Sequence, residues 1–206
     1  MNRKATSMLL RGVLAALMLS AVFAASASAN NWKFEGKELT GSEVILGGAF
    51  ESSLTIPGLT TKCENFLYKL TIKNEGGAGK GEVTELPLYN CTTSSKNCAV
   101  AAIKAEKLPW AAHTTAVSST NYIVIEGVRV SILYSGELCA LDETTAIVTG
   151  SAGGRIDNTA ETATFDAASF SATGTALKAL GSTIEWNGVF PTEAFQWHRN
   201  EALSVS

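Results

Sequence analysis

The chain has 206 residues, of which 46% are hydrophobic and 17% are charged, and it carries a net charge of −3. This length predicts one domain that can bury a core of its own. The acidic balance argues against nucleic acid and anionic membrane surfaces as partners, because both attract a basic protein surface.

Residues 1–29 have the three parts of a secretory signal peptide. Three basic residues precede Gly12–Ala24, an apolar run without a charge, and small residues then continue to Ala29. A basic start, an apolar centre and a small-x-small site define such a peptide. The apolar run is shorter than the roughly 20 residues that span a bilayer. We predict cleavage after Ala29, or as a second choice after Ala27, and no transmembrane segment in the remaining chain.

The predicted mature chain, residues 30–206, is expected to be a single β-rich secreted domain. It keeps all nineteen acidic residues but only thirteen of the sixteen basic ones, so its net charge falls to −6. The expected location is extracellular, with association with the cell wall as a variant of it.

Four cysteines lie in this mature chain: Cys63, Cys91, Cys98 and Cys139. An even number in an exported chain predicts two disulfides. We favour Cys63–Cys91 with Cys98–Cys139, because each cysteine borders a strand-like run that can lie beside its partner's. The main rival pairs Cys91 with Cys98 and Cys63 with Cys139. A zinc site is not expected, because the chain has no CxxC pair and only two histidines.

Apolar and polar residues alternate with a period of two along most of the mature chain. The runs Phe66–Lys73 and Val128–Ser135 each place a row of apolar side chains on one face, which is typical of strands. Further strands are expected at Glu43–Leu46, Ser52–Ile56, Gly81–Leu86, Ala99–Lys104, Tyr122–Glu126, Thr144–Thr149, Glu161–Asp166 and Ser182–Asn187.

Glycine-rich turn signals separate these runs. They lie at Pro57-Gly58, Asn74–Gly81, Glu126-Gly127, Ser135-Gly136, Gly150–Gly154, Asp157-Asn158 and Asn187-Gly188. Many short strands with such turns predict an all-β fold, either a single antiparallel β-sandwich or a barrel, stapled by the two disulfides. The segment Pro191–Leu203 fits a short helix or a strand.

No combination of residues in the sequence indicates an active site. Gly76–Gly81 has only part of a phosphate-binding loop, because Lys80 is followed by glycine, and a hairpin turn is expected there. The two histidines, His113 and His198, are not accompanied by a GxSxG serine motif. Carboxylates that a hydrolase could pair are Asp142, Glu143, Asp157, Asp166, Glu185 and Glu193. We predict no catalytic residue, no metal ligand and no cofactor.

The tryptophans are the better candidates for a binding site. Trp32, Trp110, Trp186 and Trp197 are each flanked by polar or turn residues. Aromatic side chains exposed on a β scaffold can stack on sugars or anchor a protein partner. Trp110 and Trp186 are therefore the candidate binding aromatics, and the competing interpretation places them in the core.

A series of short motifs resembles one group of exported proteins. The motifs are NW-x-x-x-G from Asn31, Cys63, L-x-x-C from Leu88 to Cys91, Cys98, L-P-W from Leu108 to Trp110, Cys139 and G-S-x-G-G from Gly150 to Gly154. The group comprises small secreted proteins that occur in many copies in high-GC Gram-positive (actinobacterial) bacteria. The resemblance implies export and cysteine pairing, and it implies no activity.

Together these features predict an exported β domain that binds something and is not an enzyme. The expected partner is cell-wall polysaccharide or an exported protein. The alternatives are a secreted hydrolase that uses a pair of carboxylates and an inert structural or coat component.

Overall fold

The computed structural model of the protein describes residues 30–191, 193–196 and 199–206. The predicted signal peptide lies outside the described residues, as do Trp197 and His198. Within the described residues, no helix is long and apolar enough to span a membrane.

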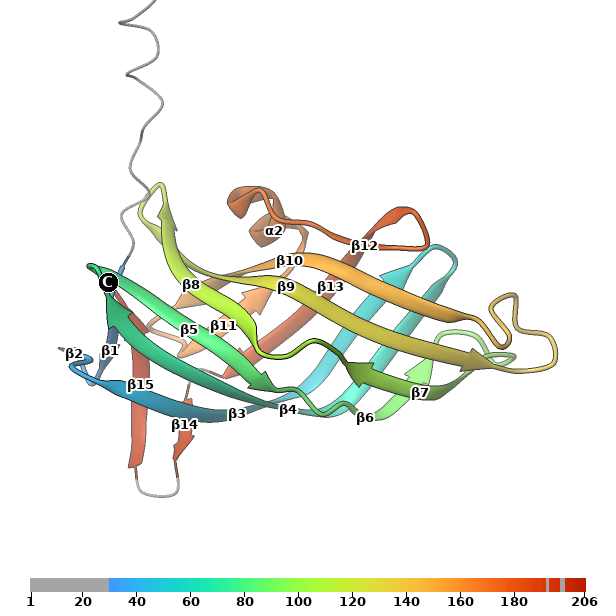
Figure 1. The fold of residues 1–206 in the computed structure, drawn as a ribbon, viewed down its shortest axis with the longest axis horizontal. Helices are drawn as coiled ribbons and strands as arrows, with labels where there is room; N and C mark the ends of the chain where they lie inside the picture. Colours follow the sequence, from blue (N-terminus) through green and yellow to red (C-terminus); the bar gives the residue numbers. More distant parts are fainter. Residues whose placement is uncertain (1–29, 192, 197–198) are drawn as a thin grey trace, which may run out of the picture.

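The described chain is almost entirely β-structure, as predicted (Figure 1). The strands are β1 (Trp32–Phe34), β2 (Lys37–Glu38), β3 (Ser42–Ile56), β4 (Leu59–Glu75), β5 (Ala78–Glu85), β6 (Tyr89–Thr93), β7 (Ala99–Ala105), β8 (Trp110–Val117), β9 (Thr120–Ser135), β10 (Thr145–Asp157), β11 (Thr162–Phe165), β12 (Leu177–Ala179), β13 (Ser182–Pro191), β14 (Glu193–Gln196) and β15 (Arg199–Val205). The described residues also contain one helix, α2 (Ala167–Thr173).

Eleven strands, β3 to β13, form one antiparallel sheet that closes into a barrel. They occupy eight positions, because three positions are each filled by two shorter strands end to end. Strands β5 and β6 share one edge of β4, β8 and β7 share one edge of β9, and β11 and β12 lie between β10 and β13. The barrel closes where β13 pairs with β3, with Trp186 opposite Leu54. Of the two closures the sequence allowed, the barrel is the one formed.

The predicted apolar rows face the interior of the barrel. On β4, Leu70 and Ile72 are buried, and on β9, Ile132 and Tyr134 have no exposed surface. Three of these four residues, Ile72, Ile132 and Tyr134, are β-branched or aromatic, and such side chains pack well on a pleated surface. The period-two prediction is confirmed for both strands.

The buried face changes parity midway along the longest strands. On β4 the even-numbered Leu70 is buried in one half, and the odd-numbered Thr61 and Cys63 are buried in the other half. On β3, Ile45 and Ser52 show the same change, although β3 and β4 stay in one register throughout. Each strand therefore contributes to the core over its whole length while it curves round the barrel.

Three of the predicted turns are wrong. Glu126-Gly127 lies within β9, Gly150–Gly154 within β10, and Asn187-Gly188 within β13. At Gly153 an added Cβ would lie 2.0 Å from the Thr173 hydroxyl of α2, so the missing side chain lets the helix approach the barrel wall. Gly153 in β10 therefore marks a close approach, whereas Gly127 in β9 has no neighbour within 4 Å and takes a left-handed conformation, with φ of +71°.

The segment Pro191–Leu203, which fitted a helix or a strand, forms strands in its described residues. Pro191 ends β13, and β14 pairs with β15 in a second sheet of order β14–β15–β1–β2. In Figure 1 this small sheet lies at one end of the barrel, where the first and last described strands pair. Trp32, Leu203 and Val205 are buried there.

The disulfides are Cys63–Cys91 and Cys98–Cys139, which confirms the favoured pairing. Cys63 and Cys91 lie opposite each other on β4 and β6. The second bridge ties the start of β7 to the loop between β9 and β10. Both disulfides therefore lie in the half of the barrel that is farther from the terminal sheet, and they link neighbouring segments there.

Candidate functional site: two apolar cavities inside the barrel

The barrel interior is not completely filled by its side chains. A cavity of about 70 Å³ lies toward the terminal sheet, and a second of about 50 Å³ lies beyond it. Leu86, Trp110 and Trp186 line both cavities, so the two adjoin at these residues. Each is several times larger than the roughly 10–15 Å³ that one water molecule occupies on such a measure.

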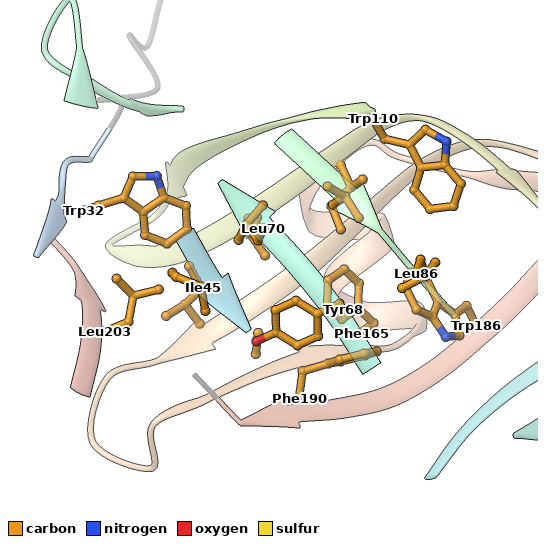
Figure 2. A pocket seen from close by; sticks show the side chains of 15 residues that line it. Trp32, Ile45, Tyr68, Leu70, Leu86, Trp110, Phe165, Trp186, Phe190 and Leu203 are labelled. Atoms are coloured by element: carbon orange, nitrogen blue, oxygen red, sulfur yellow. The ribbon is translucent and has the colours of Figure 1, made fainter. Parts of the chain in front are cut away.

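Aliphatic and aromatic side chains make up nearly the whole lining of the larger cavity. Figure 2 shows Trp32 and Leu203 at one end of this group and Trp110 and Trp186 at the other. Among the described residues no charged side chain lines either cavity. A charged molecule bound there would find no side chain of opposite charge, so the interior suits a neutral apolar ligand.

Four aromatic rings from three strands form the wall of the larger cavity. The rings of Phe165 and Trp186 stack with centroids 4.7 Å apart, and Phe190 meets both edge to face. Tyr68 meets Phe190 edge to face at 6.1 Å. Offset and edge-to-face pairs of this kind hold one another in fixed orientations. The side chains of the wall therefore fix its shape without help from another molecule.

Tyr68 brings a hydroxyl group into this apolar wall (Figure 2). Its ring lies over Gly47 on β3, where an added Cβ would come within 2.3 Å of the ring. Glycine at this position therefore makes room for the tyrosine. Burial raises the pKa of Tyr68 to about 12, so the phenol is neutral at ordinary pH.

Trp110 and Trp186, the candidate binding aromatics, both face the interior. Trp110 is buried, and its indole Nε1 donates a hydrogen bond to the carbonyl of Glu106 at 2.8 Å. The same residue, Glu106, accepts an ion-pair hydrogen bond from Arg129 at 2.8 Å, and the pair anchors the loop outside the barrel. The two tryptophans thus lie together, as candidates for one site, but at the junction of the cavities instead of on an outer surface.

The smaller cavity differs from the larger one because two hydroxyl-bearing residues, Ser52 and Thr61, contribute to its lining. The Thr61 hydroxyl and the Tyr134 hydroxyl hydrogen-bond each other at 2.7 Å. Burial raises the pKa of Tyr134, and the hydrogen bond to Thr61 only partly offsets this effect. Ser52 is 7% exposed. Within the part of the chain that the structure describes, its hydroxyl has no hydrogen-bond partner.

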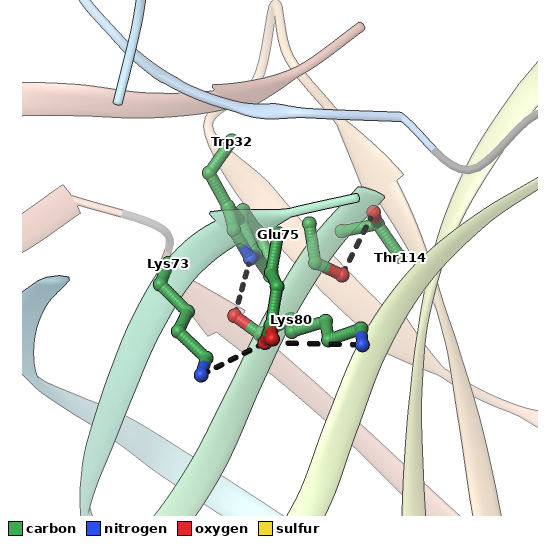
Figure 3. A network of polar contacts seen from close by, with 6 residues as sticks. Trp32, Lys73, Glu75, Lys80 and Thr114 are labelled. Carbon is green, nitrogen blue, oxygen red and sulfur yellow. Dashed lines mark hydrogen bonds and ion pairs between the residues drawn. The ribbon is translucent and has the colours of Figure 1, made fainter. Parts of the chain in front are cut away.

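The indole of Trp32 closes the end of the larger cavity. Its Nε1 donates to the carbonyl of Lys80 at 3.0 Å, as Figure 3 shows. Asn74 holds the backbone of the same strand: its side chain accepts from Trp32 N at 2.7 Å and donates to the carbonyls of Trp32 and Leu39. These bonds fix β1 against the tip of the β4–β5 hairpin.

Two further asparagines hold the last strand in the same way. The Asn121 amide donates to the carbonyl of Val205 at 2.7 Å. The Asn158 side chain donates to that carbonyl and accepts from Val205 N. Because these asparagines come from different hairpin ends, the terminal sheet is fastened to the rim on several sides.

The remaining sequence candidates lie outside the barrel interior. Gly76–Gly81 lies in the β4–β5 hairpin, as expected. Within it, the Lys80 Nζ lies 3.8 Å from the Glu75 Oε2 (Figure 3). His113 lies on β8 and lines a polar groove on the outer wall beside α2, together with Glu126 and Ser151.

The aspartates proposed for a hydrolase have structural roles. Asp142 accepts from Gly136 N, and Asp157 accepts from the backbone of Thr159 and Ala160. Asp166 is the N-cap of α2: burial alone would raise its pKa, but hydrogen bonds from Ser169 and Ala168 and the charge of Arg155 together outweigh burial and hold the pKa below its usual value. Within the described residues no group of three or more His, Cys, Asp or Glu side chains could hold a metal ion.

Several residues of the cavities were missed by the sequence analysis. Phe165 and Phe190 were not singled out, although each belongs to an alternating run. Ser52 gave no signal at all, because a serine at the start of a predicted strand is ordinarily solvated. Helix α2 had a usable signal, with an N-cap aspartate and Gly174 in a left-handed conformation at its end.

Comparison of the chain with protein-family models, with curated proteins and with solved structures finds no match. The resemblance to exported actinobacterial proteins stays a prediction. The geometry of the barrel interior is therefore the ground for assigning a function.

Proposed function

We propose that the protein is an exported, non-enzymatic binding protein that holds a small neutral apolar molecule inside its barrel. The observation that carries this proposal is the pair of adjoining cavities with an apolar lining free of charged side chains in the described residues. An eight-position barrel is just wide enough to be filled by side chains or to hold one small ligand. The unfilled space favours the second use.

Export is supported by two independent features. The first is the signal-peptide pattern of residues 1–29, and the second is the pair of disulfides. Disulfides persist in oxidising compartments outside the cytoplasm. A ligand-binding protein in that location acts as a carrier or scavenger of a molecule that is poorly soluble in water.

Binding to cell-wall polysaccharide or to an exported protein stays a prediction. It was argued from exposed tryptophans, and the three tryptophans described, Trp32, Trp110 and Trp186, all line the larger cavity. Co-sedimentation of the mature domain with purified cell walls tests it separately. The aspartates considered for a carboxylate hydrolase cap turns and a helix, so they give that alternative no support.

Benzene is the probe for the proposed function, since it is small, apolar and uncharged. Three tryptophans line the cavity, so binding is expected to change the intrinsic fluorescence. A ligand at about 100 times its Kd stabilises the folded state by about 2.7 kcal/mol, which for a chain of this size raises Tm by about 5–10 °C. Glycerol at the same concentration is the polar control. An unchanged Tm and an unchanged fluorescence at saturating benzene would refute the proposal.

A further inference from the structure

The two hydroxyl-bearing residues that line the smaller cavity lie close together. Ser52 on β3 and Thr61 on β4 are diagonal neighbours, because Ser52 pairs with Cys63 and Thr61 lies two residues before Cys63. Both residues are buried and both line the smaller cavity. The rest of that lining is aliphatic, apart from Trp110, Trp186 and the sulfur of Cys63.

The Ser52 hydroxyl is the group whose chemistry is unused. The residue is only 7% exposed and lines the smaller cavity, and its hydroxyl has no hydrogen bond to another described residue. By contrast, Thr61 already shares a hydrogen bond with Tyr134. Among the described residues the only fully enclosed side-chain oxygen or nitrogen without a partner is Asn31 Oδ1, so the Ser52 oxygen keeps some accessible surface, on the cavity that the residue lines. A polar group of a ligand in the cavity can therefore form a hydrogen bond with Ser52.

We infer that the smaller cavity holds the polar end of an elongated ligand, a neutral molecule with an apolar body and one terminal hydroxyl or carbonyl group. This inference rests on the proposed function and specifies its ligand class. The apolar body lies in the larger, aromatic-walled cavity, and the polar end passes the junction at Leu86, Trp110 and Trp186 to reach Ser52. A simple primary alcohol has this form.

The absence of charged side chains from the described lining sets the specificity. An ionised carboxylate or ammonium group beside Ser52 would lose its hydration and gain only a neutral hydroxyl partner. The site therefore selects the alcohol or carbonyl compound over the acid anion of the same chain length.

The test uses the oxidised mature protein with 1-hexanol, hexanoate and benzene as probes, measured by tryptophan fluorescence and calorimetry. Ser52→Ala is expected to weaken 1-hexanol about five- to tenfold and to leave benzene within twofold, because benzene makes no hydrogen bond. Ser53→Ala is the matched control, since Ser53 is the neighbouring residue and lines neither cavity. At neutral pH hexanoate is expected to bind at least a hundredfold more weakly than 1-hexanol.

The outcomes separate the two proposals. If benzene and 1-hexanol both bind but Ser52→Ala changes neither, the ligand-binding function stands and the polar-end site is refuted. If Ser52→Ala weakens both probes equally, Ser52 acts through packing, and the inference is again refuted. If no probe binds the unmodified protein, the proposed function fails and this inference fails with it.

Discussion

Filling the larger cavity with protein atoms is the most direct perturbation of the proposed site. Ala163 on β11 lines this cavity and is buried. Ala163→Ile adds three carbon atoms to the space. An empty volume of about 70 Å³, at about 24 cal/mol per Å³, corresponds to about 1.7 kcal/mol of stability. We therefore expect the variant to be more stable by about 1–2 kcal/mol and its Tm to rise by about 3–6 °C.

The same substitution at a packed position is the control. Ala146 on β10 has no exposed surface and lines neither cavity. Extra carbon atoms in a filled core cost about 1–3 kcal/mol, so Ala146→Ile is expected to lower Tm. Urea denaturation gives the free energy of unfolding for both variants, and benzene titration gives their affinities. Ala163→Ile should reduce benzene affinity at least tenfold, whereas a loss of stability equal to that of Ala146→Ile would show that no usable space exists there.

Three further predictions concern stability. Replacing Cys98 and Cys139 together by serine removes a bridge across 41 residues, worth about 4 kcal/mol in the chain-entropy model, and should lower Tm by about 10 °C in a thermal scan. Asn74→Ala removes three hydrogen bonds to the backbone of Trp32 and Leu39, and urea denaturation should show that the free energy of unfolding falls by about 2–3 kcal/mol. An unchanged midpoint would mean that these bonds do not hold the terminal sheet. Because burial raises the pKa of Tyr68 to about 12, folding favours the protonated phenol, so the contribution of this group to stability is constant below about pH 9 and is lost as pH rises toward 12. Between about pH 9 and 11 the free energy of unfolding should fall by about 1.4 kcal/mol from this group, and Tyr68→Phe should reduce that fall.

Local patterns predicted the strands well where the two faces of the sheet lie in different environments. The runs Phe66–Lys73 and Val128–Ser135 alternate because one face meets the core and the other meets water. Strand β8 was missed, since its sequence places Ala112 and Thr114 at inward positions and so shows little apolar contrast. Thr114 is tolerated there because its hydroxyl donates to the carbonyls of Asn30 and Gly79.

Glycine was the main source of error in the turn predictions. In Gly150–Gly154 the residues look like a loop when read alone, because glycine has no preference for a strand. In the fold these glycines lie inside β10, where the carbonyl of Ala176, the end of α2 and the ring of Phe165 approach Gly150, Gly153 and Gly154 too closely for a side chain. Only a partner distant in sequence creates that requirement, so no local pattern reveals it.

The sequence by itself determined the all-β class, the period of the strands and the set of residues that could form disulfides, and it predicts the export signal, because each depends on neighbours along the chain. The tertiary structure decided the rest. Pairing of β13 with β3 chose a barrel over a sandwich, and it joins residues more than a hundred positions apart. That closure turned Trp110 and Trp186 inward and buried Ser52, since the side of a strand that faces the core is settled only when the sheet has curved round on itself.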